Sequence, residues 1–189
     1  MPQSELLKRV VRALNESDIP YMITGSFVSS LQGEPRSTHD IDILVALRPS
    51  AIDSLVVAFP PPDFYLDRDS IIRAIKDRGM FNLIYVPEGD KVDFWILTDE
   101  PFDRSRFARR RREIVFGEEL VISAPEDTIL AKLRWAKLSG GSEKQFVDAL
   151  RIYEVQYPNL DLKYLERWAK DLSIAKLWQR LKQEAETVM

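Results

Sequence analysis

The chain of 189 residues contains no cysteine and only one histidine. Without cysteine there is no disulfide framework and no zinc–thiolate centre, and one histidine excludes a multi-histidine metal site. The apolar runs are too short to span a bilayer and the N-terminus shows no signal-peptide pattern, so we expect a cytoplasmic protein with no membrane partner. The length suits one domain, or one domain with a helical appendage.

Two aspartates, Asp40 and Asp42, stand two residues apart at the start of an apolar stretch. Residues two apart on a strand point to the same side, so this pattern aims two carboxylates at one place. Asp93 lies in a second apolar stretch and joins the pair if the two strands are neighbours. Three such carboxylates repel one another unless a cation lies between them, and oxygen ligands favour Mg²⁺ or Mn²⁺. The plainer alternatives are a turn-capping pair and a solvated Asp93.

A glycine and a serine, Gly25 and Ser26, follow an apolar strand that is expected over residues 20–24. In most proteins this pair is an ordinary turn between a strand and a helix. The functional alternative is a phosphate site, in which Gly25 lets the backbone approach a triphosphate and Ser26 binds its oxygens together with the first helical N–H groups. Carboxylate-held Mg²⁺ beside such a turn indicates chemistry on a nucleoside triphosphate.

The periodicity of apolar residues predicts an α+β core in residues 1–123, followed by a helical region in residues 124–189. A helix capped by Ser4 is expected to end near Asn15, and a helix capped by Asp69 and Ser70 to end at Gly79. Further strands are expected over residues 40–47, 81–86, 91–97, 114–116 and 120–122. Further helices are expected over residues 27–31, 49–58, 125–138, 142–157, 161–171 and 173–187.

Six arginines fall within nine residues, and we expect them on one helix. They are Arg104, Arg106, Arg109, Arg110, Arg111 and Arg112. The plain interpretation is a solvated helix face, and the alternative is a patch that contacts the phosphates of a nucleic acid or a triphosphate. Because the arginines spread around a helix, they do not all face one ligand.

Three motifs together resemble the nucleotidyltransferase (polymerase-beta-like) fold superfamily. They are Tyr21–Ser26, Asp40–Ile43 and Val92–Phe94, in the order and spacing of that superfamily. Residues 36–42 are similar to the Arg-x-Thr-x-Asp-x-Asp form of abortive-infection toxin nucleotidyltransferases (AbiEii-like) and uncharacterised bacterial relatives. Residues 125–153 are similar to the helical region of the same proteins, so the resemblance covers residues 20–153. It implies a mixed β-sheet core with helices, followed by a C-terminal helical region.

The resemblance also implies roles for residues outside the acids. Arg36 and Thr38 precede the aspartate pair, and Arg36 either clamps phosphate or holds the loop in place. Lys132 corresponds to a lysine that contacts the nucleotide in the toxin-like relatives, although other basic residues of its helix compete for this position. Asp148 is expected either to pair with Lys144 on its own helix or to support the site.

Together these features predict a Mg²⁺-dependent nucleotidyltransferase. It would move a nucleoside monophosphate from a nucleoside triphosphate to a hydroxyl of an RNA, a protein or a small molecule, with release of pyrophosphate. Asp40 and Asp42 would hold the metal, and Asp93 would be the third ligand and the base. Two alternatives stay open: a non-catalytic nucleotide- or RNA-binding protein with the same fold, and a toxin of a toxin–antitoxin pair that modifies tRNA. The sequence indicates neither the acceptor nor the oligomeric state.

Overall fold

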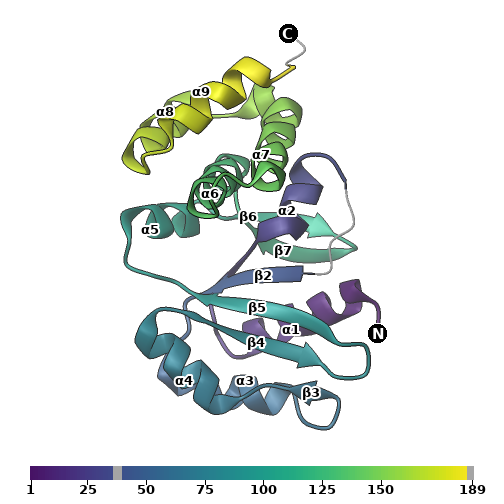
Figure 1. The fold of residues 1–189 in the computed structure, drawn as a ribbon. Helices are drawn as coiled ribbons and strands as arrows, with labels where there is room; N and C mark the ends of the chain where they lie inside the picture. The colour runs from purple at the N-terminus through teal and green to yellow at the C-terminus, as the bar shows by residue number, and fades with distance from the viewer. Residues whose placement is uncertain (36–39, 187–189) are drawn as a thin grey trace. The chain divides into compact units, whose positions relative to one another are not determined.

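A computed structural model describes residues 1–35 and 40–186 of the chain (Figure 1). The chain forms two compact units. The sheet unit consists of Met1–Thr24 and Thr38–Ile122, and the helical unit consists of Gly25–Ser37 and Ser123–Met189. Strands and helices follow each other as expected for an α+β protein, so the predicted fold class is confirmed.

A mixed sheet forms the centre of the sheet unit (Figure 1). Within the described residues its strands are β1 (Tyr21–Thr24), β2 (Asp40–Val45), β3 (Phe64–Tyr65), β4 (Met80–Tyr85), β5 (Asp90–Ile96), β6 (Arg111–Val115) and β7 (Glu118–Ile122). Their order is β3-β4-β5-β2-β1-β7-β6. Strand β2 pairs in parallel with β5 and β1 pairs in parallel with β7, while the other neighbours are antiparallel. The two predicted hairpins, β4–β5 and β6–β7, are both present.

One face of this sheet is buried under helices because its strands alternate in polarity. Ile41 and Ile43 of β2 have no exposed surface, and Phe94 of β5 stacks on Phe81 of β4 at 4.9 Å between ring centroids. The helices of the sheet unit are α1 (Gln3–Glu16), α3 (Ile52–Ala58), α4 (Arg68–Asp77) and α5 (Pro101–Ala108), with a short 3₁₀ helix at Pro49–Ala51. Helix α4 contacts β4 and β5, and α3 contacts α1 and α4.

The ends of two helices differ from the sequence expectation. Helix α1 follows Pro2 rather than a capping Ser4, and no side chain caps its first turn. Helix α4 is capped two residues earlier than predicted, because the Asp67 carboxylate accepts a hydrogen bond from the backbone N–H of Ser70 at 2.8 Å. Arg78 then ends the helix with a left-handed φ of 52°, immediately before Gly79.

The arginine cluster does not form one helix, so that prediction was wrong. Arg104 and Arg106 lie on α5, whereas Arg111 and Arg112 lie on strand β6. The hairpin predicted after the cluster is longer than expected, since its backbone ladder continues to the pairing of Arg111 with Ile122. The backbone partners offered by β7 extend the strand into the arginine run.

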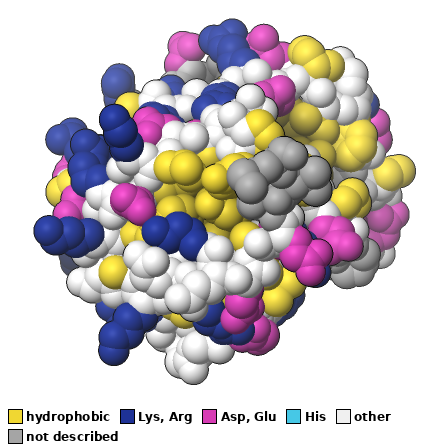
Figure 2. Space-filling model, turned by 90° about the horizontal axis from the view of Figure 1, so that it is seen from above, with side chains coloured by type: hydrophobic (Ala, Val, Ile, Leu, Met, Phe, Trp, Pro, Cys, Tyr) yellow, Lys and Arg dark blue, Asp and Glu magenta, His cyan; other side chains and the backbone are white. Residues whose placement is uncertain are grey.

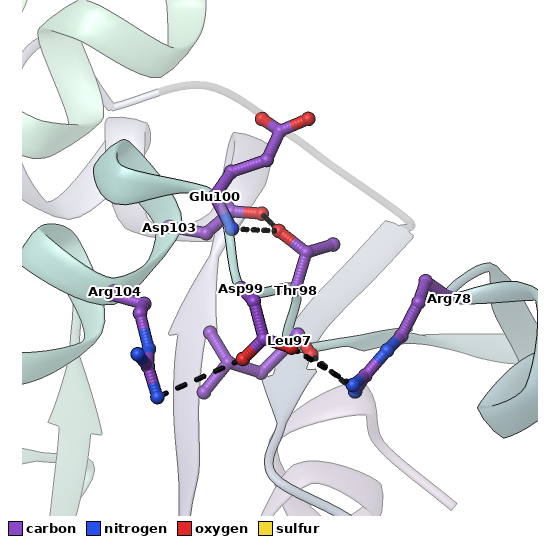
Figure 3. A network of polar contacts seen from close by, with 7 residues as sticks. All are labelled: Arg78, Leu97, Thr98, Asp99, Glu100, Asp103 and Arg104. Atoms are coloured by element: carbon purple, nitrogen blue, oxygen red, sulfur yellow. Dashed lines mark hydrogen bonds and ion pairs between the residues drawn. The ribbon is translucent and has the colours of Figure 1, made fainter.

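A polar network fixes the chain between β5 and α5 (Figure 3). The guanidinium of Arg78 donates to the carbonyl of Leu97 at 3.3 Å and pairs with Asp99 at 3.1 Å. The hydroxyl of Thr98 donates to the buried carboxylate of Asp103 at 2.5 Å and accepts from the backbone N–H of Glu100 at 3.2 Å. These contacts tie the end of α4 and the start of α5 to the segment that leaves β5.

The helical unit consists of α2 (Gly25–Gln32), α6 (Pro125–Leu138), α7 (Glu143–Gln156), α8 (Leu162–Asp171) and α9 (Ala175–Glu184), with a 3₁₀ helix at Tyr157–Asn159. The predicted C-terminal helices are therefore confirmed. Helix α2 approaches α7 closely, because a Cβ atom on Gly33 would lie 2.9 Å from the backbone nitrogen of Ile152. Of the tryptophans of this unit, Trp168 and Trp178 are buried, whereas Trp135 is 50% exposed.

Ion pairs on the surface of the helical unit connect neighbouring helices. Arg180 of α9 donates two hydrogen bonds to Glu143 of α7, at 2.7 and 3.0 Å, and stacks on the ring of Phe146.

Side chains of both charges are interspersed on the face drawn in Figure 2. Among the described residues, no helix combines the length and the apolar character that crossing a membrane requires.

Candidate active site

The sheet register brings the predicted acids together. Strand β2 lies parallel to β5, and the Cα atoms of Asp42 and Asp93 are direct partners. Asp40 lies two residues before Asp42, so the pleat puts all three side chains on one side of the sheet. This side is opposite to the one that buries Ile41 and Ile43. The condition on which Asp93 was predicted to join the pair, neighbouring strands, is therefore met.

Asp93 is held by an ion pair and a hydrogen bond at the same oxygen. The ammonium of Lys91 lies 3.1 Å from Oδ1 of Asp93, and the side-chain amide of Asn82 on β4 also donates to this atom. Asn82 stands opposite Asp93 in the antiparallel β4–β5 ladder. Only 14% of the Asp93 side chain is exposed. A carboxylate that is this buried needs such donors, because burying an unpaired charge is costly.

Asp42 is oriented by a tryptophan of the neighbouring strand. The indole N–H of Trp95 donates to Oδ1 of Asp42 at 3.2 Å. The same tryptophan packs against an apolar cluster of Met22, Leu44 and Phe107. This packing restricts the indole ring, and the ring in turn fixes one oxygen of the carboxylate.

Sequence reasoning missed Asn82, Lys91 and Trp95. The signal was present, because residues 91, 93 and 95 are spaced two apart on one strand and so point to the same side as each other. The hairpin turn after β4 also sets the register that puts Asn82 opposite Asp93. The sequence pattern predicted the carboxylates but not the side chains that bind them.

The chemistry of these three acids fits a divalent cation such as Mg²⁺ or Mn²⁺, since they offer oxygen ligands on one side of two adjacent strands. The side chains of these acids are not arranged around one point as a bound ion would require. Within residues 1–35 and 40–186, no three His, Cys, Asp or Glu side chains are placed so that they hold one ion. The oxygens of Asp42 and Asp93 that are fixed here face Trp95, Lys91 and Asn82.

The glycine–serine pair has the geometry of a tight turn at the start of a helix. Gly25 has a φ of 70°, a left-handed value that glycine adopts without the strain of a side chain. It follows Thr24, which is the backbone partner of Asp42 on β1. Ser26 lies in the first turn of α2, and its carbonyl accepts from the hydroxyl of Ser29 at 3.0 Å. The predicted phosphate site is therefore a real strand–helix turn, and its role in binding stays a prediction.

Lys132 lies inside the helical unit and bridges two helices. Its ammonium lies 2.8 Å from a carboxylate oxygen of Asp148 on α7 and 3.4 Å from the hydroxyl of Ser26 on α2. Lys132 and Asp148 are both buried. The sequence had considered Lys144 as the partner of Asp148, and the structure shows Lys132 in contact with it instead. The nucleotide-binding role of Lys132 stays a prediction, as do those of Arg36 and Thr38, which lie outside the described residues.

The arginine cluster is largely engaged in contacts within the chain. Arg106 pairs with Asp103 at 2.9 Å, Arg112 pairs with Glu119 at 2.9 Å, and Arg104 lies 3.7 Å from Asp99. Arg110 donates to a backbone carbonyl at 2.5 Å and stacks on the ring of Phe107. These contacts favour the plain interpretation of the cluster over a single phosphate patch.

Neither a protein-family model nor a curated protein sequence matches this chain. Solved structures do match it. The solution structure of the antibiotic-resistance factor ANT(2'')-Ia is 14% identical, with a TM-score of 0.55 and coverage of 96% of this chain and 98% of that one. A nucleotidyltransferase-like antigen from Paracoccidioides brasiliensis is 17% identical, with a TM-score of 0.50 and coverage of 95% and 93%.

The chain has the nucleotidyltransferase fold. The resemblance found in the three sequence motifs is thus confirmed at the level of the fold. A crystal structure of ANT(2'')-Ia in complex with adenylyl-2''-tobramycin has the same TM-score of 0.55, at 13% identity and with coverage of 92% of this chain and 98% of that one. At such identities the likeness extends to the fold alone, and the similarity to abortive-infection toxins stays a prediction.

Proposed function

We propose that this protein is a nucleotidyltransferase that uses a nucleoside triphosphate and Mg²⁺ or Mn²⁺. The observation that carries the proposal is the register of β2 and β5, which puts Asp42 beside Asp93 in a chain with the nucleotidyltransferase fold. Asp40, Asp42 and Asp93 would hold the metal. When bound, such an ion neutralises charge on the phosphate oxygens and helps to orient them.

The side chains and backbone of the protein would bind the triphosphate, accept the proton and keep the acids in position. Gly25 and Ser26 would receive the triphosphate at the start of α2, where backbone N–H groups point outward. Asp93 would accept the proton of the acceptor hydroxyl. That oxygen then bonds to the α-phosphorus, the bond between this phosphorus and the bridging oxygen breaks, and pyrophosphate leaves. Trp95 and Asn82 would keep Asp42 and Asp93 in place, which limits the reorganisation that the reaction requires.

The test is transfer of label from each of the four nucleoside triphosphates in the presence of Mg²⁺. The acceptor mixtures are total RNA, total protein and a panel of antibiotics that includes tobramycin, the last chosen because ANT(2'')-Ia was solved in complex with adenylyl-2''-tobramycin. Asp42→Asn should lose transfer by orders of magnitude. Asp53→Asn is the matched control, because Asp53 is an exposed acid that pairs with Arg68 on the surface.

The same assay separates the alternatives. Nucleotide binding without any transfer, in wild type and Asp42→Asn alike, would favour a non-catalytic nucleotide- or RNA-binding protein. Label that appears in tRNA, together with arrest of growth on expression, would favour a toxin of a toxin–antitoxin pair. Label in a small molecule or a protein would identify another acceptor class.

A further inference from the structure

Lys91 brings a positive charge into the group of acids. Its Cα atom is the direct partner of Asp40 across the β2–β5 ladder. Its ammonium lies 3.1 Å from Oδ1 of Asp93. Lys91 and Asp93 are two residues apart on β5, so both side chains leave the sheet on the side of Asp40 and Asp42. One lysine therefore pairs with Asp93 and lies opposite Asp40 in the ladder.

Lys91 offsets the negative charge of the acids and occupies an oxygen of Asp93 that a metal ion would use. Oδ1 of Asp93 already receives the Lys91 ammonium and the Asn82 amide, and the described residues contain no three-acid group placed to hold an ion. We propose that Lys91 is a built-in counter-ion of the site, which exchanges with the divalent metal. In the metal-free protein it balances the acids, and metal binding requires its ammonium to leave Asp93. This inference rests on the proposed function.

The side chain is suited to such an exchange. Lys91 is 43% exposed, so its ammonium reaches water by a rotation of its flexible stem, without disturbing the buried face of β5. A lysine and a divalent cation at the same carboxylate repel each other. The exchange therefore weakens the binding of free metal. A metal that arrives with a triphosphate brings compensating negative charge, so the device favours the metal–nucleotide complex over the metal alone.

The experiment measures binding of Mn²⁺ to the full chain without nucleotide, followed by electron paramagnetic resonance of the free ion. Lys91→Gln should bind Mn²⁺ about tenfold more tightly than wild type, the size of effect expected from a single charge a few ångströms away in a partly solvated site. Lys91→Met, which keeps the apolar stem, should act in the same way if the glutamine variant folds poorly. Lys91→Arg keeps the charge and should bind Mn²⁺ within about threefold of wild type.

Lys8→Gln is the matched control, because Lys8 pairs with Glu5 on helix α1 and its loss changes the net charge equally. A second readout is the melting temperature in EDTA, which Lys91→Gln should lower while it increases the upward shift produced by Mn²⁺. This readout does not depend on catalysis or on the identity of the acceptor.

Two results would overturn the inference, and they are distinguishable. If Lys91→Gln and Lys91→Met bind Mn²⁺ no more tightly than Lys8→Gln, while Asp42→Asn and Asp93→Asn lose the ion, the acids bind metal and Lys91 does not compete. If all these variants bind Mn²⁺ as wild type does, the metal does not bind at the acids, and the proposed function loses its metal site as well.

Discussion

Replacement of Asp42 by asparagine should stabilise the metal-free protein while it abolishes transfer. Asparagine has nearly the shape of aspartate, and its side-chain oxygen still accepts the hydrogen bond that the indole of Trp95 donates to Asp42. The substitution therefore removes one negative charge and leaves the packing around it unchanged. Stability and activity are expected to move in opposite directions, which a simple loss of folding would not produce.

The size of the stabilisation follows from the register. Asp42 and Asp93 are direct partners on adjacent strands, which lie about 4.8 Å apart. Two unit charges at this distance repel by ~0.9 kcal/mol in bulk water and by ~3.5 kcal/mol at an effective dielectric constant of 20. Asp40 adds a weaker repulsion. The lost attraction to Lys91 and the weaker hydrogen bond from Trp95 offset part of this gain, so we expect a net stabilisation of ~1 kcal/mol.

The assay is thermal unfolding by circular dichroism in EDTA and again in millimolar Mg²⁺ or Mn²⁺. For a chain of this length, ~1 kcal/mol corresponds to a rise of about 2–4 °C in the melting temperature. Metal should stabilise wild type by mass action and the variant less. Asp53→Asn, at an exposed acid that pairs with Arg68, should change stability by less than ~0.5 kcal/mol in either solution.

The outcome that refutes the reasoning is specific. If Asp42→Asn melts at a lower temperature than wild type in EDTA, and metal shifts neither protein, the acids do not repel one another and do not bind an ion. The proposed enzyme would then lack its metal site, whatever the fold. A variant that melts higher in EDTA but still transfers label would retain the charge argument and remove Asp42 from catalysis.

Three further predictions concern the helical unit. Lys132→Met leaves the buried carboxylate of Asp148 without its ammonium partner and should cost about 3–5 kcal/mol in urea unfolding, most of which the added change Asp148→Leu restores. Hydrogen bonds from Arg180 lower the pKa of Glu143, so this pair stabilises the fold above the unfolded pKa and the contribution is lost as pH falls through the lower folded pKa. The stability difference between wild type and Arg180→Gln in urea should therefore narrow below about pH 4. Gly33→Ala forces a Cβ against the backbone of α7 and should cost about 1–3 kcal/mol, measured by thermal unfolding.

The parts of the fold that the sequence predicted well have strong local signals. The alternation of Ile41 and Ile43 with the acids fixed both the strand and the side to which the acids point. Helices α6 to α9 were expected because apolar residues recur at helical spacing between clear breaks. The fold was predicted from three short motifs in order, although no family model matches the sequence.

The parts that were missed depend on pairing between distant strands. Nothing local in Arg111 and Arg112 indicates a strand, and these residues join β6 because β7 offers backbone partners. The same holds for Asn82, whose role as a donor to Asp93 exists only through the β4–β5 register. The partner of Asp148 was also non-local, since Lys132 reaches it from another helix.

The register that brings the acids together is held by the other face of the sheet. Shifting β2 by one residue would separate Asp42 from Asp93 and relieve their repulsion, but it would also turn Ile41 and Ile43 out of the core. Burial of each isoleucine contributes about 1.5–3 kcal/mol, and both have no exposed surface. The repulsion between the two acids is ~0.9 to ~3.5 kcal/mol, whereas burial of both isoleucines contributes about 3–6 kcal/mol, so the apolar face decides the register. Strand β2 therefore cannot shift its register to separate Asp42 from Asp93. The repulsion between the acids has to be reduced by the positive charge of Lys91 or of a metal ion.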